Sequence, residues 1–407
     1  MEVKVKTRKL FAIAGSVCLM LVIAALPFMA ACAAPEPTPV PTPTPTPTPV
    51  VPTPTPAPEK VIEIKWSTYY PVLHPMNYDC YGIWLKELDE RTNGRTSSIM
   101  FGGGSMATPK ENYNAVNTGM ADMGDVWCPP NPGVFPLAEM WHLPYMAPTA
   151  AISAQSIYRY TTTHEEALNE FEKNFHFVAQ HSSAIQNLHT TADAGLVKTL
   201  EELKGMLLGT DNPKTVGWFC DMGAACTRID THDAYLALEK GVIQGGVWPW
   251  APLRSQKITE FAVNHTIIDL MFVVSNVLMN KEKWESFPQD IKAIINEIGG
   301  ADLSAFAGYT LTNGSLTDVK YMKDKGDQFY TLPPDEKARW SVYTEAAVQE
   351  WIDEVTAKGL TTRAEQLYKD AHTIVAEVTG NPMPEMEWWG PDAVGRYGSP
   401  NRPGGWK

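Results

Sequence analysis

The chain has 407 residues, a net charge of −13 and 33 prolines. This length allows more than one domain of ordinary size, and the acidic balance argues against nucleic acid as a partner. Beyond the N-terminal leader no apolar run is long enough to span a bilayer. The nearest is 266–279, and it contains Asp269.

The first residues have the pattern of a secretory signal. A cluster of four cations precedes an uncharged run over 10–29, and Ala30 and Ala31 lead to Cys32. A basic start, an apolar middle and small residues predict a signal peptide over 1–31. The cysteine after the small pair resembles the lipobox of bacterial lipoproteins, which implies cleavage and acylation at Cys32, although Met29 replaces the usual leucine. An uncleaved N-terminal membrane helix is the alternative, and either would hold the chain at a membrane outside the cytoplasm.

A proline- and threonine-rich run follows over 32–59. Proline at nearly every second position removes backbone donors, so neither helix nor sheet is expected. Such a segment is extended and semi-rigid. We therefore predict a tether between the membrane and a folded part.

From Lys60 onward strand and helix patterns alternate. The predicted strands are 62–66, 97–101 and 120–127, and the predicted helices are 78–91 and 108–119. The second helix has Thr108 as N-cap, Pro109 at the first helical position, Glu111 completing a capping box and Gly119 closing it. The alternation predicts a mostly parallel sheet with helices on both faces.

A second unit repeats this scheme before the chain turns helical. Further strands are expected at 175–182 and within 265–280, and a segment that starts with the capping box Thr199–Glu202 and ends at Gly205. The segments 115–127 and 237–248 both read as helix end, glycine, strand and closing tryptophan. Because ligands lie beyond the carboxyl ends of parallel strands, Trp127 and Trp248 are expected to face one gap from two lobes, unless both belong to the core. Beyond Phe287 apolar residues recur at helical spacing almost to the end.

Neither cysteine nor histidine spacing indicates a metal site. Cys80, Cys128, Cys220 and Cys226 match no zinc pattern, and a disulfide between the last two stays open. No nucleophile motif such as G-x-S-x-G is present. We therefore expect no metal, no cofactor and no catalytic activity.

Six segments in order resemble the solute-binding proteins of TRAP transporters, the dicarboxylate-binding type. They are a Gly-Arg pair at 94–95, the strand and glycine-rich turn at 99–105, the capped helix and G-x-A-D strand at 108–122, and the later segments 134–146, 200–205 together with 235–249, and 277–295. The resemblance covers about 60–380. It implies an α/β, two-lobed periplasmic-binding-protein-like fold with crossing strands, a long connecting helix and a helical C-terminal part.

The resemblance also implies a division of the chain and a function. The expected parts are the signal peptide 1–31, the tether 32–59, lobe I over 60–182 with later crossing segments, lobe II over 183–280, a helical part over 281–385 packing on both lobes, and a Gly/Pro/Trp-rich tail over 386–407. Lobes of this kind close on a small organic acid and deliver it to TRAP permease subunits in the membrane. A lipid-anchored, extracytoplasmic protein is thus expected, with a binding lipoprotein of an ATP-driven importer as the alternative.

The sequence departs from the family at the solute site. Gly209 stands where members carry the arginine that clamps a carboxylate, and Val247 and Trp248 replace a Glu-Asn pair. Aromatic walls with few polar anchors suit an aromatic or hydrophobic acid. The predicted ligand-binding residues are Tyr69, Tyr70, Trp127, His189, Gly209, Asn212, Trp248 and Trp250. His189 or Asn212 is expected to hold the polar end of the solute, with Arg228 as an alternative cation that otherwise sits at the surface.

Overall fold

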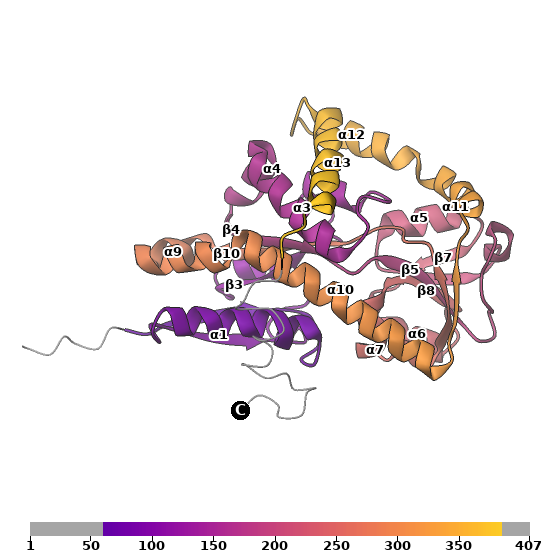
Figure 1. Cartoon of the computed structure of the whole chain (residues 1–407), viewed down its shortest axis with the longest axis horizontal. Helices are drawn as coiled ribbons and strands as arrows, with labels where there is room; N and C mark the ends of the chain where they lie inside the picture. Colours follow the sequence, from indigo (N-terminus) through magenta and orange to yellow (C-terminus); the bar gives the residue numbers. More distant parts are fainter. Residues whose placement is uncertain (1–59, 385–407) are drawn as a thin grey trace, which may run out of the picture. The chain divides into compact units, whose positions relative to one another are not determined.

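The computed structural model describes residues 60–384. The predicted signal peptide, the acylated Cys32, the tether over 32–59 and the tail over 386–407 lie outside these residues and stay predictions. Figure 1 shows the order of the helices and strands along the described chain.

Two sheets organise the described residues. The first has the strand order β2-β1-β3-β10-β4, and the second has the order β11-β9-β5-β8-β6-β7. The strands of the first sheet are β1 (Ile62–Ser67), β2 (Thr96–Phe101), β3 (Met123–Trp127), β4 (Phe175–Ser182) and β10 (Val274–Asn280). Those of the second are β5 (Gln186–Thr191), β6 (Leu207–Thr210), β7 (Ala225–Arg228), β8 (Gly245–Pro249), β9 (Ala262–Ile267) and β11 (Gln328–Thr331). The strands predicted from period-two alternation are confirmed.

Both sheets are mixed, which corrects the expectation of mostly parallel sheets. β10 runs antiparallel to β3 and β4, and β5 runs antiparallel to β8 and β9. The cause is that the chain crosses between the sheets twice. A strand that arrives from the other sheet enters at the edge where the resident strands end, so it runs antiparallel to them. The two crossing segments also bond to each other: the Ser183 N–H donates to Val273 O at 2.6 Å and the Gln186 N–H to Met271 O at 2.9 Å.

Helices cover the sheets. The longer ones are α1 (Gly82–Arg91), α3 (Ala150–Thr163), α4 (Glu165–Glu172), α5 (Pro213–Asp221), α9 (Gln289–Ile298), α10 (Gly300–Lys325), α11 (Pro334–Ser341), α12 (Ala346–Ala357) and α13 (Ala364–Gly380). Shorter α-helices are α2 (Asn112–Asn117), α6 (Ala234–Glu239), α7 (Trp250–Ser255) and α8 (Lys281–Ser286). The π-helix η1 (Met76–Tyr81) precedes α1, and single turns of 3₁₀-helix are η2 (Ala138–His142), η3 (Leu200–Leu203), η4 (Thr231–Asp233), η5 (Ile258–Glu260) and η6 (Val342–Thr344).

Corrections apply both to the predicted helix starts and to the part expected to be helical. The Thr199–Glu202 capping box forms as expected, but it opens a single 3₁₀ turn, η3. The Thr108 hydroxyl donates to Glu111 Oε2 at 2.7 Å, yet α2 begins only at Asn112 because the residues before it form a turn. The second correction is β11, a strand inside the part expected to be helical, which forms because β9 leaves a sheet edge that it pairs in parallel.

Helix α10 is the predicted long connecting helix, with 26 residues. Near its start, Ser304 Oγ accepts the Gln180 N–H of β4 at 3.1 Å, and near its end Asp318 pairs with Arg254 of α7 at 3.5 Å. In Figure 1 the helix passes from β10 and β4 to α6 and α7. It therefore contacts the helices and strands of both lobes.

Gly308 lies where α10 crosses α3. A Cβ at this position would lie 2.8 Å from Ala150 O and from the side chain of Ala154. We expect Gly308→Ala to lower the free energy of unfolding by about 1–3 kcal/mol, since overpacking at this crossing outweighs the gain in helix propensity. Urea unfolding followed by circular dichroism measures this. Gly314→Ala on the same helix is the matched control, because its Cβ would meet only Pro75 Cγ at 4.0 Å. A Gly308→Ala protein as stable as the control would contradict the tight crossing.

The described residues hold two hydrophobic clusters. The larger spans the first sheet, its helices and the C-terminal helices. The smaller lies in the second lobe around Trp248, Trp250 and Met322. Between the two sheets the packing is less complete, and the cavity described next occupies that region.

Candidate functional site

A cavity of about 350 Å³ is lined by residues of both lobes and of the crossing segments. Most of its lining follows the carboxyl end of a strand: Tyr69 comes after β1, Trp127 ends β3, Asp211 comes after β6 and Arg228 ends β7. Ligands bind at this position in open α/β sheets. Ser183, Ala184, Gln186 and Val273 line it from the two crossings.

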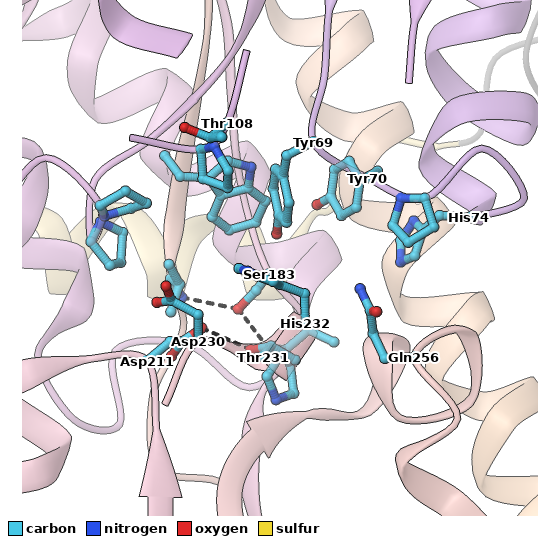
Figure 2. A pocket seen from close by; sticks show the side chains of 18 of the residues that line it. Tyr69, Tyr70, His74, Thr108, Ser183, Asp211, Asp230, Thr231, His232 and Gln256 are labelled. Carbon is cyan, nitrogen blue, oxygen red and sulfur yellow. Dashed lines mark hydrogen bonds between the residues drawn. The ribbon is translucent and has the colours of Figure 1, made fainter. Parts of the chain in front are cut away.

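The first lobe contributes an aromatic wall. The rings of Tyr69 and Tyr70 stack with centroids 4.9 Å apart, and His74 stacks on Tyr70 at 4.3 Å. Trp127 meets Tyr69 edge-on at 5.5 Å. Figure 2 shows Tyr69, Tyr70 and His74 in a row along one side of the cavity. The wall is a flat, mostly apolar surface, suited to a planar or hydrophobic solute.

Asp125 fixes the orientation of Trp127. The indole Nε1–H donates to Asp125 Oδ2 at 2.8 Å, and the carboxyl group is 1% exposed. Burial raises the pKa of Asp125 to about 7. The side chain two residues earlier on β3 thus holds the indole in place against the tyrosines.

The second lobe contributes the polar side of the cavity. Asp211, Asp230, Thr231 and His232 lie opposite the aromatic row in Figure 2. The Thr231 hydroxyl donates to Asp211 Oδ2 at 3.0 Å. Burial raises the pKa of Asp211 to about 6, while Arg228 acts in the opposite direction. Among the lining residues the cations at neutral pH are Arg228 and Lys110, both exposed at the cavity rim.

The predicted site residues fall into two groups. Tyr69, Tyr70 and Trp127 line the cavity. His189, Gly209, Asn212, Trp248 and Trp250 are absent from its lining and pack elsewhere in the second lobe.

His189 belongs to a buried network in the second sheet. Its Nδ1 lies 2.9 Å from His265 Nδ1, its Nε2 lies 3.1 Å from Trp248 O, and it has no exposed surface. Burial lowers its pKa well below the usual value. Trp250 packs on the same two imidazoles, and its ring centroid lies 4.9 Å from that of His189 and 5.6 Å from that of His265. Both side chains therefore contribute to the core, and the polar-end role given to His189 has no support from its position.

Trp248 differs from Trp127 because of the residue two positions before it. Where β3 has Asp125, β8 has Gly246, and a Cβ there would lie 2.2 Å from the Trp248 ring. The indole lies over this glycine within the second-lobe cluster and is 0% exposed. The expectation that both tryptophans face one gap is thus corrected for Trp248, whereas the next residue of β8, Pro249, lines the cavity.

Gly209 and Asn212 have local structural roles. A Cβ at Gly209 would lie 2.9 Å from Ile243 Cδ1, so this position on β6 is filled by apolar neighbours. Asn212 caps α5, where its Oδ1 accepts the Lys214 N–H at 2.8 Å. The second-lobe cation that lines the cavity comes instead from β7, next to β6, where Arg228 lies opposite Thr210. Sequence reasoning placed Arg228 second and missed His74, Gln186 and Asp211. The available signal for these three residues was their position, because His74 and Asp211 follow strands and Gln186 lies beside a crossing.

One group of possible metal ligands among the described residues includes two residues of the cavity lining. Asp230, His232 and Asp233 have ligand atoms within 4.8 Å of one another, but all three are exposed. Exposed acidic groups of this kind are common without a metal ion. Cys220 and Cys226 are free thiols in this structure. Within residues 60–384 no helix combines the length and apolarity that crossing a membrane requires.

Residues 67–354 match the family model described as bacterial extracellular solute-binding protein, family 7. The chain belongs to this family. The expectation of a non-enzymatic, extracytoplasmic solute-binding protein is thereby confirmed.

Relatives and solved structures agree with this family. A solute-binding protein of Verminephrobacter eiseniae is 23% identical over 207 residues, which is 50% of this chain and 61% of that protein. A TRAP solute-binding protein from Rhodoferax ferrireducens, solved with copurified benzoate, superposes with a TM-score of 0.73 at 20% identity and covers 79% of this chain and 99% of its own. A marine-metagenome TRAP protein described as specific for aromatic acids, solved with 3-hydroxybenzoate, has a TM-score of 0.72 at 23% identity, with 78% and 99% covered. These solved structures support the two-lobed fold of this family 7 member.

Proposed function

We propose that this family 7 protein captures an aromatic monocarboxylate between its lobes and delivers it to TRAP permease subunits. One observation carries the proposal: a stacked aromatic wall on the first lobe and Arg228 of the second lobe line the same cavity. The ring of the solute would lie against Tyr69, Tyr70 and Trp127. Its carboxylate would pair with the guanidinium of Arg228, whose fork matches a carboxylate bidentately.

The shape and charge of the cavity favour one carboxylate over two. Its volume of about 350 Å³ is near the lower end for small-ligand sites, which suits a single ring with one or two substituents. Asp211 and Asp230 share the second-lobe side with Arg228, so a second carboxylate would meet repulsion there. The usual arginine position on β6 is Gly209, where apolar neighbours leave no room for a long side chain.

The crossings supply the movement that capture requires. They are the two segments 183–185 and 268–273, bonded to each other by backbone hydrogen bonds. Ser183 Oγ accepts the Val273 N–H at 3.0 Å, which locks them further. Short paired connections of this kind let two rigid lobes rotate about a hinge while the site stays between them.

The N-terminal part completes the proposal. Acylation at Cys32 would anchor the protein to the outer face of a membrane, and the tether over 32–59 would keep the lobes close to their permease. The acidic charge of the chain disfavours direct adsorption of the lobes to an anionic lipid surface.

Native mass spectrometry of residues 58–407, a range that holds all the described residues, tests the proposal. We expect an added mass that matches an aromatic acid, released on denaturation and rebound from a panel of benzoate derivatives. An empty protein would be titrated directly with the same panel by calorimetry. Recovery of an aliphatic dicarboxylate, or binding of succinate in preference to every aromatic acid, would contradict the proposal.

A further inference from the structure

Besides Asp211 Oδ1 on the second-lobe side, three uncharged side chains on the cavity hold polar atoms that have no protein hydrogen-bond partner. They are the Tyr70 hydroxyl, His74 Nε2 and both amide atoms of Gln186. Their residues are 5%, 1% and 0% exposed, respectively. Buried polar groups are nearly always bonded, because leaving one unsatisfied costs its full desolvation. Unpaired groups gathered on one cavity therefore indicate a bound group that pairs with them.

The protonation of His74 follows from its surroundings. The Met76 N–H donates to His74 Nδ1 at 3.2 Å, so Nδ1 is an acceptor and the ring proton is assigned to Nε2. Burial lowers the pKa of His74 to about 3, which keeps the imidazole neutral. His74 thus offers the cavity one uncharged N–H donor.

Tyr70 and His74 are held rigidly beside each other. The Asn77 amide donates to Tyr70 O at 2.8 Å, and the Gly103 N–H donates to the same oxygen at 2.7 Å. The two rings stack at 4.3 Å, and burial raises the pKa of Tyr70 well above its usual value, so the phenol stays neutral. Figure 2 shows both side chains toward the end of the aromatic row away from Asp211.

We propose that Tyr70, His74 and Gln186 form a second polar subsite that takes a neutral hydroxyl group of the solute. A hydroxyl both donates and accepts, and the three side chains offer the matching N–H and O–H donors together with acceptor oxygens. A carboxylate would be held instead by the cation Arg228. This inference rests on the proposed function and narrows the solute to a hydroxylated aromatic acid whose hydroxyl points away from the carboxylate.

Isothermal titration calorimetry with four probes tests the subsite: benzoate and its three monohydroxy derivatives, bound to wild-type protein, Tyr70→Phe and His74→Phe. At least one hydroxybenzoate should bind wild type about tenfold or more tightly than benzoate, because sites built for a hydroxyl reject the analogue that lacks it. The ratio of the two dissociation constants should fall to within about threefold in Tyr70→Phe, which removes one oxygen and keeps the ring stack. His74→Phe should reduce the ratio likewise. Tyr368→Phe on α13, outside the cavity lining, is the matched control and should keep the wild-type ratio.

The outcomes separate this inference from the proposed function. If benzoate binds and no hydroxybenzoate binds more tightly, the subsite is overturned and the aromatic-acid proposal stands. The same holds if the preference survives in both cavity variants. If none of the four acids binds wild-type protein, both the proposed function and the subsite fall.

Discussion

Arg228→Ala should weaken binding of an aromatic carboxylate by about 100-fold, because removing one partner of a charge pair enclosed by lobe closure leaves the other charge unpaired. Arg228 ends β7 and lines the cavity. Calorimetric titration with the best-binding acid measures the effect. Arg228→Lys should recover only part of the loss, since an ammonium keeps the charge but cannot form the two parallel hydrogen bonds of a guanidinium.

Two further variants make the Arg228 result specific. Arg254→Ala removes another exposed arginine of the same lobe, outside the cavity lining, and should leave the affinity unchanged. Lys110→Ala removes the other cation at the rim and should cost less than Arg228→Ala, because an ammonium cannot form the two parallel hydrogen bonds that a guanidinium makes with a carboxylate. An affinity that survives Arg228→Ala and collapses in Lys110→Ala would assign the carboxylate to the first lobe and reverse the proposed orientation.

Trp248→Ala should lower the free energy of unfolding by about 3–5 kcal/mol, as expected for truncating a fully buried tryptophan. The indole is 0% exposed and packs in the smaller cluster with Trp250 and Met322. Its Nε1 has no hydrogen-bond partner, so the loss is one of packing and cavity formation. Urea unfolding followed by tryptophan fluorescence and circular dichroism measures it.

Solute affinity distinguishes this structural role from a role in the cavity wall. At a temperature where the variant is folded, Trp248→Ala should bind the solute within a few-fold of wild type. Trp127→Ala is the counterpart at the end of β3 and should lose affinity, because its ring lies beside Tyr69 on the cavity. A Trp248→Ala protein of normal stability with strongly reduced affinity would return Trp248 to the solute site.

Much of the fold could be read from local patterns. The strand at 62–66 was predicted from alternating apolar residues, the capping box at Thr199 from its Thr and Glu spacing, and the lobes from landmarks in a fixed order. These signals are local because backbone hydrogen bonding and burial of one face act over a few residues. The aromatic pair after the first strand was also accessible, since side chains beyond the ends of parallel strands meet at one edge.

The roles of the two tryptophans depended on packing that the shared strand pattern does not encode. Trp127 and Trp248 close similar segments, yet Asp125 holds one indole at the cavity and Gly246 lets the other lie flat in the core. The same applies to the cation, because the neighbours of Gly209 exclude a long side chain and the adjacent strand presents Arg228 instead.

The sequence by itself determined the strands at 62–66, 97–101, 120–127 and 175–182, the capping box at Thr199, the family and the aromatic segment that lines the first lobe. Only the tertiary structure decided the mixed sheets, because strand direction depends on where a crossing chain enters a sheet. It also decided which aromatic and charged side chains reach the cavity. The local sequence pattern decides on which face of a strand a side chain lies. Residues distant in sequence decide what covers that face.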